Sequence, residues 1–486
     1  MRRLTGLDAS FLYLETPNNH MHVASTYVFE PGLTYESVRD LIANRLHLLQ
    51  PFRWRLVEVP FGIHHPVWVD DPDFDLEYHV RRDALPPPGG RIELERFAAE
   101  LMGRPLDRRR PLWELHVVEG LEGGGVAIVT KTHHAAIDGV SGAELTTTLF
   151  DTTPEPTTYT DVPAWKPERI PSDAEMLAHS LRSLSRHPLR FAEALKNTVE
   201  VAFQVRDRAQ QQPVQVSVPF RAPRTSINVP ITPHRAFATS SVPLAAIKEV
   251  RAAFGGTVND VVLAMCASAL RKYLINGSEL PPEPLNAMVP ISVRNTDQQG
   301  DMGNRVAQML VSLETHLADP VERLASIRAH TTSAKEMSNA IGATTLADWA
   351  EFAAPAVAAR AARLYSGMRL ANRHKPLFNV TISNVPGPAF PLYSAGVRLT
   401  AWYPMGPIFD GTGLNLTVMS YMGVMHFGVV GCRETVRSVH EIATALEEAM
   451  EELLTAARAT SGAAAAPVKA VRPASKRRPK AKVTTG

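Results

Sequence analysis

The stretch Lys131-Thr132-His133-His134-Ala135-Ala136-Ile137-Asp138-Gly139 lies between a predicted strand and a predicted helix. The strand covers residues 126–132, where β-branched residues alternate with others after a run of three glycines. The helix is predicted from Ser141 to residues 149–150, because Glu144 stands three positions after Ser141 and can complete a capping box. The histidines, the aspartate and the glycine are therefore expected on a strand-to-helix connection, where side chains can face a cleft.

The residue types in this connection fit proton-transfer chemistry. A neutral imidazole has a pKa near ~6.5 and can accept a proton from an alcohol or an amine at neutral pH. Asp138 can hold the connection closed by pairing with an arginine, and Gly139 permits a turn that other residues resist. A structural alternative is that the histidine pair only caps or packs against the helix.

The pattern His133-His134-x-x-x-Asp138-Gly139 resembles the active-site motif of the coenzyme A-dependent acyltransferase superfamily. That superfamily includes chloramphenicol acetyltransferase, the condensation domains of peptide synthetases, and the bacterial wax ester synthase/diacylglycerol acyltransferases (WS/DGAT). The resemblance implies that His134 is a general base, that His133 orients the connection, that Asp138 fixes it, and that Gly139 permits close backbone approach.

Two segments of the first half also resemble the WS/DGAT branch. The first is the opening, residues 7–16 and 19–22, in which we interpret His20 and His22 as packed or hydrogen-bonded rather than catalytic. The second is Pro111-Leu112-Trp113, at the start of a strand predicted beside the motif strand. Because this tripeptide contains no reactive group, we interpret it as packing that shapes a tunnel wall.

Two motifs of the second half resemble the same branch. Asn259-Asp260 lies in the first turn of a predicted helix that begins after Thr257, and an acid there suits a capping role without catalysis. Asn384-Val385-Pro386 follows a strand predicted over residues 377–382, at a turn shaped by prolines and glycine. Asn384 is open to two interpretations, a hydrogen-bond donor near the reaction centre or a residue that fixes the turn.

The superfamily resemblance also implies an arginine partner for the motif aspartate. Residues 52–56 predict a strand-like run with two arginines on one side, so Arg53, with Arg55 second, is expected to pair with Asp138. The alternative is that both arginines are ordinary surface charges.

Length and composition are those of a globular protein. The chain has 486 residues, of which 45% are hydrophobic and 21% charged, so two domains are expected. No transmembrane helix, signal peptide, metal-ligand spacing or phosphate-binding glycine loop is predicted. With two distant cysteines, the expectation is a cytoplasmic enzyme without a bound metal or cofactor, for which acyl-CoA is a cosubstrate.

Two basic regions are candidates for lipid contact. Residues 459–486 are predicted to form a disordered basic tail, and residues 182–203 combine basic residues with a helical apolar period. Either region can touch an anionic membrane surface or lipid droplet. The tail can equally be a solubilising or nonspecific nucleic-acid-binding extension, and the helix can simply connect two domains.

The fold class expected from the resemblance is α/β, with two chloramphenicol acetyltransferase-like domains. Each domain would be a mixed sheet flanked by helices, with a tunnel between them. The predicted boundaries are 1–160 for the N-terminal domain, 161–235 for connecting helices and loop, 236–458 for the C-terminal domain and 459–486 for the tail.

The function implied is esterification of diacylglycerol, and of long-chain alcohols, by acyl-CoA. One rival is a condensation-type or polyketide-tailoring acyltransferase that uses a carrier-protein thioester. The other rival is a non-catalytic protein that has the same fold and binds lipid droplets.

Overall fold

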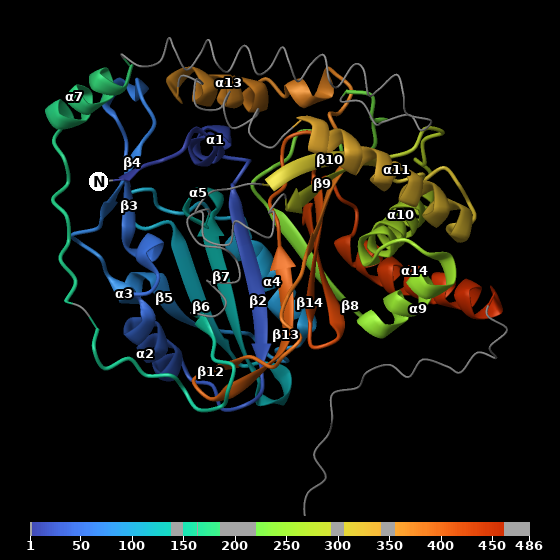
Figure 1. The fold of residues 1–486 in the computed structure, drawn as a ribbon, viewed down its shortest axis with the longest axis horizontal. Coiled ribbons are helices and arrows are strands. Elements are labelled where there is room, and N and C mark those ends of the chain that lie inside the picture. Colours follow the sequence, from blue (N-terminus) through green and yellow to red (C-terminus); the bar gives the residue numbers. More distant parts are fainter. Residues whose placement is uncertain are drawn as a thin grey trace, which may run out of the picture.

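The computed structural model describes residues 2–137, 149–162, 164–184, 220–292, 306–341 and 355–460. The strands in these ranges form two six-stranded sheets and one three-stranded sheet (Figure 1). Each large sheet contains both parallel and antiparallel neighbours and is flanked by helices, which confirms the predicted mixed α/β architecture.

The N-terminal sheet has the strand order β12-β13-β2-β7-β6-β5. Its strands are β12 (Tyr393–Ser394), β13 (Val397–Met405), β2 (His22–Phe29), β7 (Val126–His133), β6 (Trp113–Glu119) and β5 (Val80–Ala84). The motif strand β7 lies in the interior between β2 and β6, and both neighbours run antiparallel to it. The prediction that the strand starting at Trp113 lies beside the motif strand is therefore confirmed.

The C-terminal sheet has the order β10-β9-β11-β14-β15-β8. Its strands are β10 (Val306–Ser312), β9 (Asn286–Ser292), β11 (Val380–Val385), β14 (Leu414–Tyr421), β15 (Val424–Cys432) and β8 (Arg235–Pro243). β14 and β15 form an antiparallel hairpin. The helices packed on this sheet are α9 (Leu244–Phe254), α10 (Val258–Asn276), α11 (Pro320–Ile341) and α14 (Val439–Thr460).

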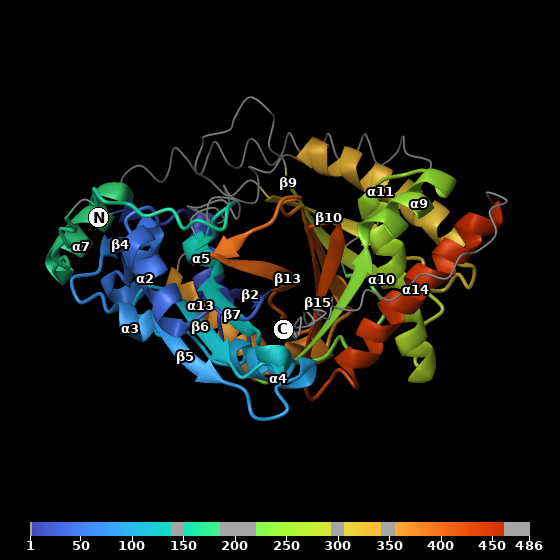
Figure 2. The same cartoon turned by 90° about the horizontal axis from the view of Figure 1, so that it is seen from below.

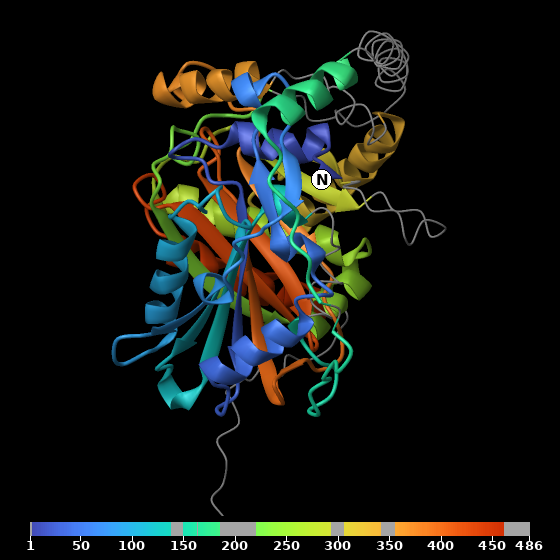
Figure 3. The ribbon, with the colours of Figure 1, turned by 90° about the vertical axis from the view of Figure 1, so that its left-hand side faces the viewer.

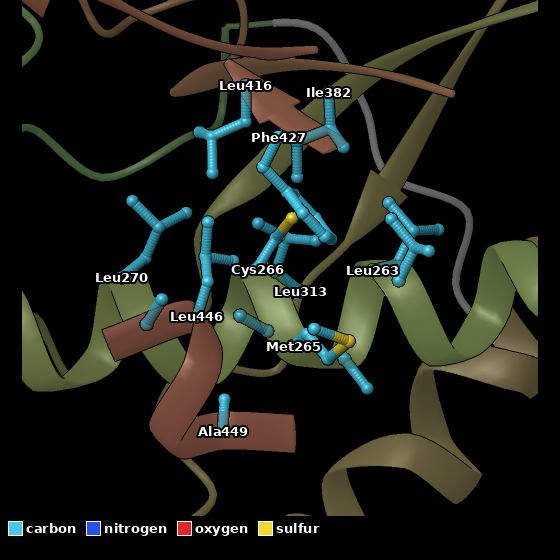
Figure 4. Packing of buried hydrophobic residues seen from close by; sticks show 14 of the residues in the cluster. Leu263, Met265, Cys266, Leu270, Leu313, Ile382, Leu416, Phe427, Leu446 and Ala449 are labelled. Carbon is cyan, nitrogen blue, oxygen red and sulfur yellow. The ribbon is translucent and has the colours of Figure 1, made fainter. Parts of the chain in front are cut away.

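The largest hydrophobic core lies between this sheet and its helices. Helix α10 is buried along nearly its whole length because apolar residues occupy most faces of it. In Figure 4, Cys266 of α10 lies close to Phe427 of the sheet, and Leu446 of α14 reaches the same cluster. Cys266 and Cys432 are both buried and unpaired.

The two halves interlock. Strands β12 and β13 come from the second half of the chain but complete the N-terminal sheet, so both halves of the chain contribute strands to that sheet. β13 also passes close to β15, where a Cβ on Gly428 would stand 1.7 Å from the carbonyl oxygen of Pro404. Only glycine allows that approach.

Helix α4 (Arg91–Met102) joins the two sheets from the side (Figure 2). Its buried Glu95 accepts hydrogen bonds from the backbone N–H of Thr239 at 2.7 Å and from the hydroxyl of the same residue at 2.6 Å. His440 of α14 contacts the other carboxylate oxygen at 2.9 Å. One carboxylate of the first half is thus held by a strand and a helix of the second.

A smaller unit covers the end of β7 that leads to the motif. It contains the sheet β1-β4-β3 and helix α1 (Gly6–Leu14), and α1 packs between helix α5 (His134–Ile137) and helix α13 (Pro355–Gly367) (Figures 1 and 3). The remaining elements are β1 (Arg2–Arg3), β3 (Trp54–Val57), β4 (Val67–Asp70), α2 (Tyr35–Arg45), α3 (Leu76–His79), α7 (Asp173–Leu184), η1 (Gln50–Arg53), η2 (Pro60–Gly62), η3 (Glu122–Gly124) and η4 (Leu370–Asn372).

Two predicted local structures are wrong. Arg53 ends a short 3-10 helix rather than lying on a strand, because Pro51 favours helical backbone at its start, and only Arg55 belongs to β3. Asn384 lies within β11 rather than in the following turn. Parallel pairing with β14 extends that strand to Val385, and Pro386, which lacks an N–H, follows its end.

Some predictions concern residues outside the described ranges. They are the helix from Ser141, most of the basic segment at residues 182–203, and the tail. Among the described helices, none alone has the length and apolar character to cross a membrane, and α9 and α10 pass that test only as a pair bent by 101°.

Candidate active site

His134 begins helix α5, directly after β7. Its backbone N–H donates to the carbonyl of Met21 at 2.8 Å, and its ring stacks on Phe11 with centroids 4.6 Å apart and planes 14° from parallel. The Nδ1 atom is buried and has no hydrogen-bond partner among the described residues. Burial, and secondarily the neighbouring His133, lowers the pKa of His134 to about 4. The ring is therefore neutral at physiological pH.

His133 is held by hydrogen bonds at Nδ1 and at its backbone, and its Nε2 lies within ion-pair distance of Glu15. Its side chain is 1% exposed, and its N–H donates to the carbonyl of Leu112 at 2.9 Å. Nδ1 accepts from the N–H of Ala135 at 3.0 Å, so this nitrogen carries no hydrogen and the ring hydrogen lies on Nε2. Nε2 is 3.3 Å from Oε1 of Glu15.

Glu15, which follows α1, is the acidic centre of the site. Its Oε1 accepts from the N–H of Met21 at 3.1 Å and lies 3.4 Å from Nε2 of His22. Its Oε2 accepts from the guanidinium of Arg108 at 2.8 Å. Burial alone would raise the pKa of Glu15, but its contacts with His133 and His22 lower it far below the usual range. The carboxylate is therefore ionised.

No sequence pattern predicts a role for Glu15. It lies inside the opening segment that resembles the WS/DGAT branch, but a single acid at the end of a helix gives no motif. The available signal was the pairing of strands. Once residues 22–29 and 126–133 are placed side by side, their histidines meet beside the one acid that ends the preceding helix.

His20 and His22 form the rest of this cluster. The two rings stack with centroids 5.5 Å apart, and the ring of His22 meets that of His133 edge-on at 5.8 Å. Burial lowers the pKa of His22 to about 3 and that of His20 to about 4. Both side chains are buried, which agrees with the interpretation that they are packed or hydrogen-bonded, although His20 precedes β2.

A hollow of about 350 Å³ lies beside this cluster. Its lining includes Glu15, Thr16, His20, Arg108, Pro233 and Arg363. His134 is not among the lining residues, so the hollow approaches the cluster on the side of Glu15. Residues 138–148, which follow α5, lie outside the described ranges.

The Pro-Leu-Trp motif is buried and packs the motif strand. Trp113 is stacked between Phe52 and His79, with ring centroids 4.5 Å away on each side, and its indole N–H donates to the carbonyl of Phe52 at 2.8 Å. Leu112 packs in the cluster that contains Ala135 of α5. These contacts are those of a packing role.

The two motifs of the second half contact each other. Nδ2 of Asn384 lies 3.5 Å from Oδ1 of Asn259, which joins β11 to the start of α10. Asp260 is the third residue of a capping box with Thr257 and also accepts from the hydroxyl of Thr331 at 2.7 Å. Asp260 thus has the predicted capping role. Val385 and Pro386 are exposed at the end of β11.

Arg53 and Arg55 have partners other than the motif aspartate. The guanidinium of Arg53 lies 5.7 Å from the ring centroid of Trp165. That of Arg55 lies 3.7 Å from Asp71 and 3.6 Å from Asp73. Asp138 and Gly139 lie outside the described residues, so the pairing of Arg53 or Arg55 with Asp138 stays a prediction.

A buried ion pair anchors the strand that carries the motif. Nζ of Lys131 lies 3.1 Å from Glu114 of β6 and donates to the carbonyls of Leu101 and Arg104 at 3.2 and 3.1 Å. Burial lowers the pKa of this lysine, although Glu114 opposes the effect.

The described residues contain no group of three or more His, Cys, Asp or Glu side chains placed to hold a metal ion.

The fold places the chain in the class of condensation-domain-like acyltransferases. The starter condensation domain of rhizomide synthetase superimposes with a TM-score of 0.50 over 94% of each chain at 11% identity, a similarity of fold alone. A structure of a wax ester synthase/diacylglycerol acyltransferase from Marinobacter aquaeolei VT8 gives a TM-score of 0.64 at 33% identity, covering 94% of this chain and 99% of that one.

The chain belongs to the wax ester synthase/diacylglycerol acyltransferase family. The family model of its catalytic domain matches residues 4–262, and that of its C-terminal domain matches residues 302–454. A putative diacylglycerol O-acyltransferase of Mycobacterium tuberculosis is 37% identical over 93% of this chain and 90% of its own length. A probable diacylglycerol O-acyltransferase of Mycobacterium tuberculosis is 39% identical over 92% of this chain and 97% of its own length. As a member of this family, the chain is an acyl-CoA-dependent acyltransferase.

Proposed function

We propose that this enzyme esterifies diacylglycerol with the acyl group of acyl-CoA and accepts long-chain alcohols as a second class of acceptor. The observation that carries the proposal is the placement of His134 at the start of α5 inside the family's motif, with its backbone N–H held by Met21 and its Nδ1 without a hydrogen-bond partner among the described residues. The acceptor is inferred from relatives that are themselves named diacylglycerol O-acyltransferases and from a structure named wax ester synthase/diacylglycerol acyltransferase.

His134 acts as the general base. As the acceptor hydroxyl attacks the thioester carbonyl, the ring takes the hydroxyl proton, and a tetrahedral oxyanion forms. When that intermediate collapses, the C–S bond breaks, the ester is released, and the ring returns the proton to the thiolate of coenzyme A. Such a base contributes about 10²–10⁴-fold to the rate, and positioning of the reactants supplies much of the remainder.

The other motif residues have supporting roles in this proposal. His133 orients the connection through Ala135, Asp138 fixes it by pairing with Arg53 or Arg55, and Gly139 allows the backbone to approach the reactants. The two substrates reach His134 through a tunnel between the two halves. No covalent enzyme intermediate is required, because a general base is sufficient for direct transfer.

Product analysis tests the proposed substrates. Purified enzyme receives radiolabelled palmitoyl-CoA together with either diacylglycerol or hexadecanol, and the product lipids are resolved. Labelled triacylglycerol is the expected main product, with wax ester in the second reaction. Transfer only from an acyl-carrier protein, with none from acyl-CoA, would favour the condensation-type rival. Lipid binding without turnover would favour the non-catalytic rival.

The outer face of α13 is our candidate for contact with a lipid surface. Val357 and Leu364 lie seven positions apart on this helix and are 65% and 60% exposed. Phe61 of η2, which contacts α13, is 86% exposed. Arg360 is exposed beside this apolar stripe. Exposed apolar side chains next to arginine suit a surface of anionic lipid. Figure 1 shows α13 along the upper edge of the molecule.

Vesicle sedimentation tests this contact. We expect the parent enzyme to bind vesicles of anionic phospholipid, and the double variant Val357→Ser and Leu364→Ser to lose most of that binding. Ile275→Ser is the matched control, because Ile275 is also exposed but ends α10 in the C-terminal half. Equal binding by all three proteins would exclude the α13 face as the lipid contact.

A further inference from the structure

Glu15 is connected to the backbone on both sides of His134. On one side it accepts from the N–H of Met21, whose carbonyl accepts from the N–H of His134 at 2.8 Å. On the other side it faces Nε2 of His133, whose Nδ1 accepts from the N–H of Ala135. The backbone N–H groups of His134 and of Ala135 are therefore held by paths that converge on a single carboxylate.

The neighbours of Glu15 require two acceptor oxygens. Oε1 accepts from the N–H of Met21 and lies 3.3 Å from Nε2 of His133 and 3.4 Å from Nε2 of His22, and Oε2 accepts from the guanidinium of Arg108. The Met21 N–H, the Nε2–H of His133 and the guanidinium are donors. An amide in place of the carboxylate would set its NH₂ group against donors on one side or the other, whichever way it turned.

We propose that Glu15 is a positioning residue for acyl transfer, which holds the ring of His134 at the angle required for proton transfer through Met21 and His133. It does not touch the reacting atoms. Its role is to lock the hydrogen of His133 on Nε2 and to fix the first turn of α5. A displacement of the base by about 1 Å is enough to reduce turnover about 10²-fold.

The inference rests on the proposed role of His134 and makes a prediction that packing alone does not. If Glu15 only fills space, the isosteric Glu15→Gln should be tolerated better than the shorter Glu15→Asp. If its two acceptor oxygens matter, the order is reversed. Asp keeps both oxygens and its charge, whereas Gln loses one acceptor.

The experiment compares kcat, KM for acyl-CoA and Tm for the parent, Glu15→Gln, Glu15→Asp and Glu58→Gln. Glu58 is the matched control, because it is an exposed carboxylate that lies 3.7 Å from the same Arg108. We expect Glu15→Gln to lower kcat about 10²-fold with KM within about twofold, Glu15→Asp to recover part of the loss, and Glu58→Gln to match the parent.

Several results would overturn the inference. One is a Glu15→Gln variant that is as active as the parent or more active than Glu15→Asp. Another is a change confined to KM, which would place Glu15 in contact with the substrate. A third is a loss of kcat in Glu58→Gln equal to that in Glu15→Gln. If Glu15→Gln does not fold, the variants Arg108→Lys and Arg108→Gln replace the two Glu15 variants in the experiment. Lys must then retain more of kcat than Gln, since only Lys keeps a charged donor for Oε2.

Failure of this inference is distinguishable from failure of the proposed function. An inactive His134→Ala with a fully active Glu15→Gln rejects only the role of Glu15. A fully active His134→Ala rejects the base itself, whatever the Glu15 variants do.

Discussion

His22 and His133 are register partners on β2 and β7, and the Nε2 atoms of both rings lie within 3.4 Å of the same oxygen of Glu15. A buried carboxylate between two imidazoles is stable only with further donors, which the Met21 N–H and Arg108 provide. The first histidine of the motif thus belongs to a structural network, and the second is left free of side-chain hydrogen bonds among the described residues.

The lowered pKa of His134 predicts the pH dependence of catalysis. The ring is the base only when neutral, and burial lowers its pKa to about 4, so protonation removes activity only as the pH falls toward that value. We expect kcat/KM to be nearly constant from pH 8 to about pH 6 and to fall below about pH 5. A rate profile that titrates near pH 6.5 would contradict the burial of this ring.

The neutral buried histidines predict a loss of stability in acid. Burial lowers the pKa of His22 to about 3 and that of His20 to about 4, whereas in the unfolded chain both protonate near 6.5. Their neutral state therefore supports folding above pH 6.5, and the unfolded state gains protons first as the pH falls. The free energy of unfolding, measured by urea titration, should decrease steadily from pH 7 to pH 4. A free energy of unfolding that stayed constant over that interval would contradict this prediction.

Trp113 should contribute to stability rather than chemistry. Trp113→Ala removes a ring stacked between Phe52 and His79 and is expected to cost about 3–5 kcal/mol. Trp113→Phe keeps an aromatic ring but leaves the carbonyl of Phe52 without its donor, at a cost of about 1–3 kcal/mol. Urea unfolding measures both. An unchanged stability with lost turnover would instead place Trp113 at the substrate.

Asp260 should also act on stability. Asp260→Ala leaves the N–H of Thr257 without its acceptor and removes one of the two acceptors of the Thr331 hydroxyl, which is expected to cost about 1–3 kcal/mol in the free energy of unfolding. Asn at this position keeps one acceptor and should lose less. If either variant lost turnover at unchanged stability, the capping interpretation would be wrong.

Local patterns in the sequence predicted most of the fold. The alternation before His133 and the capping signal at Thr257 each depend on neighbouring residues, and the structure has a strand and a helix there. Asn384 was placed in a turn because its pairing with β14 depends on residues more than thirty positions away. The crossing of β13 into the other sheet is non-local for the same reason.

The site was predicted in part. The motif identified His133 and His134, because two histidines before a helix form a recognisable pattern. Glu15 was missed because its partners come from β7, β2 and residue 108, and no spacing in the sequence relates them. Arg55 was expected near Asp138, but the nearby Asp71 and Asp73 already lie within ion-pair distance of it.

Turnover of His134→Ala tests the central claim most directly. Transfer of labelled palmitate from palmitoyl-CoA to diacylglycerol is measured beside the parent and beside His47→Ala, a control histidine whose Nδ1 contacts the carbonyl of Asn44 and whose ring meets that of Tyr159 edge-on. We expect His134→Ala to lower the rate of transfer about 10²-fold or more at an unchanged Tm, and His47→Ala to be as active as the parent. Equal turnover in all three proteins would contradict it.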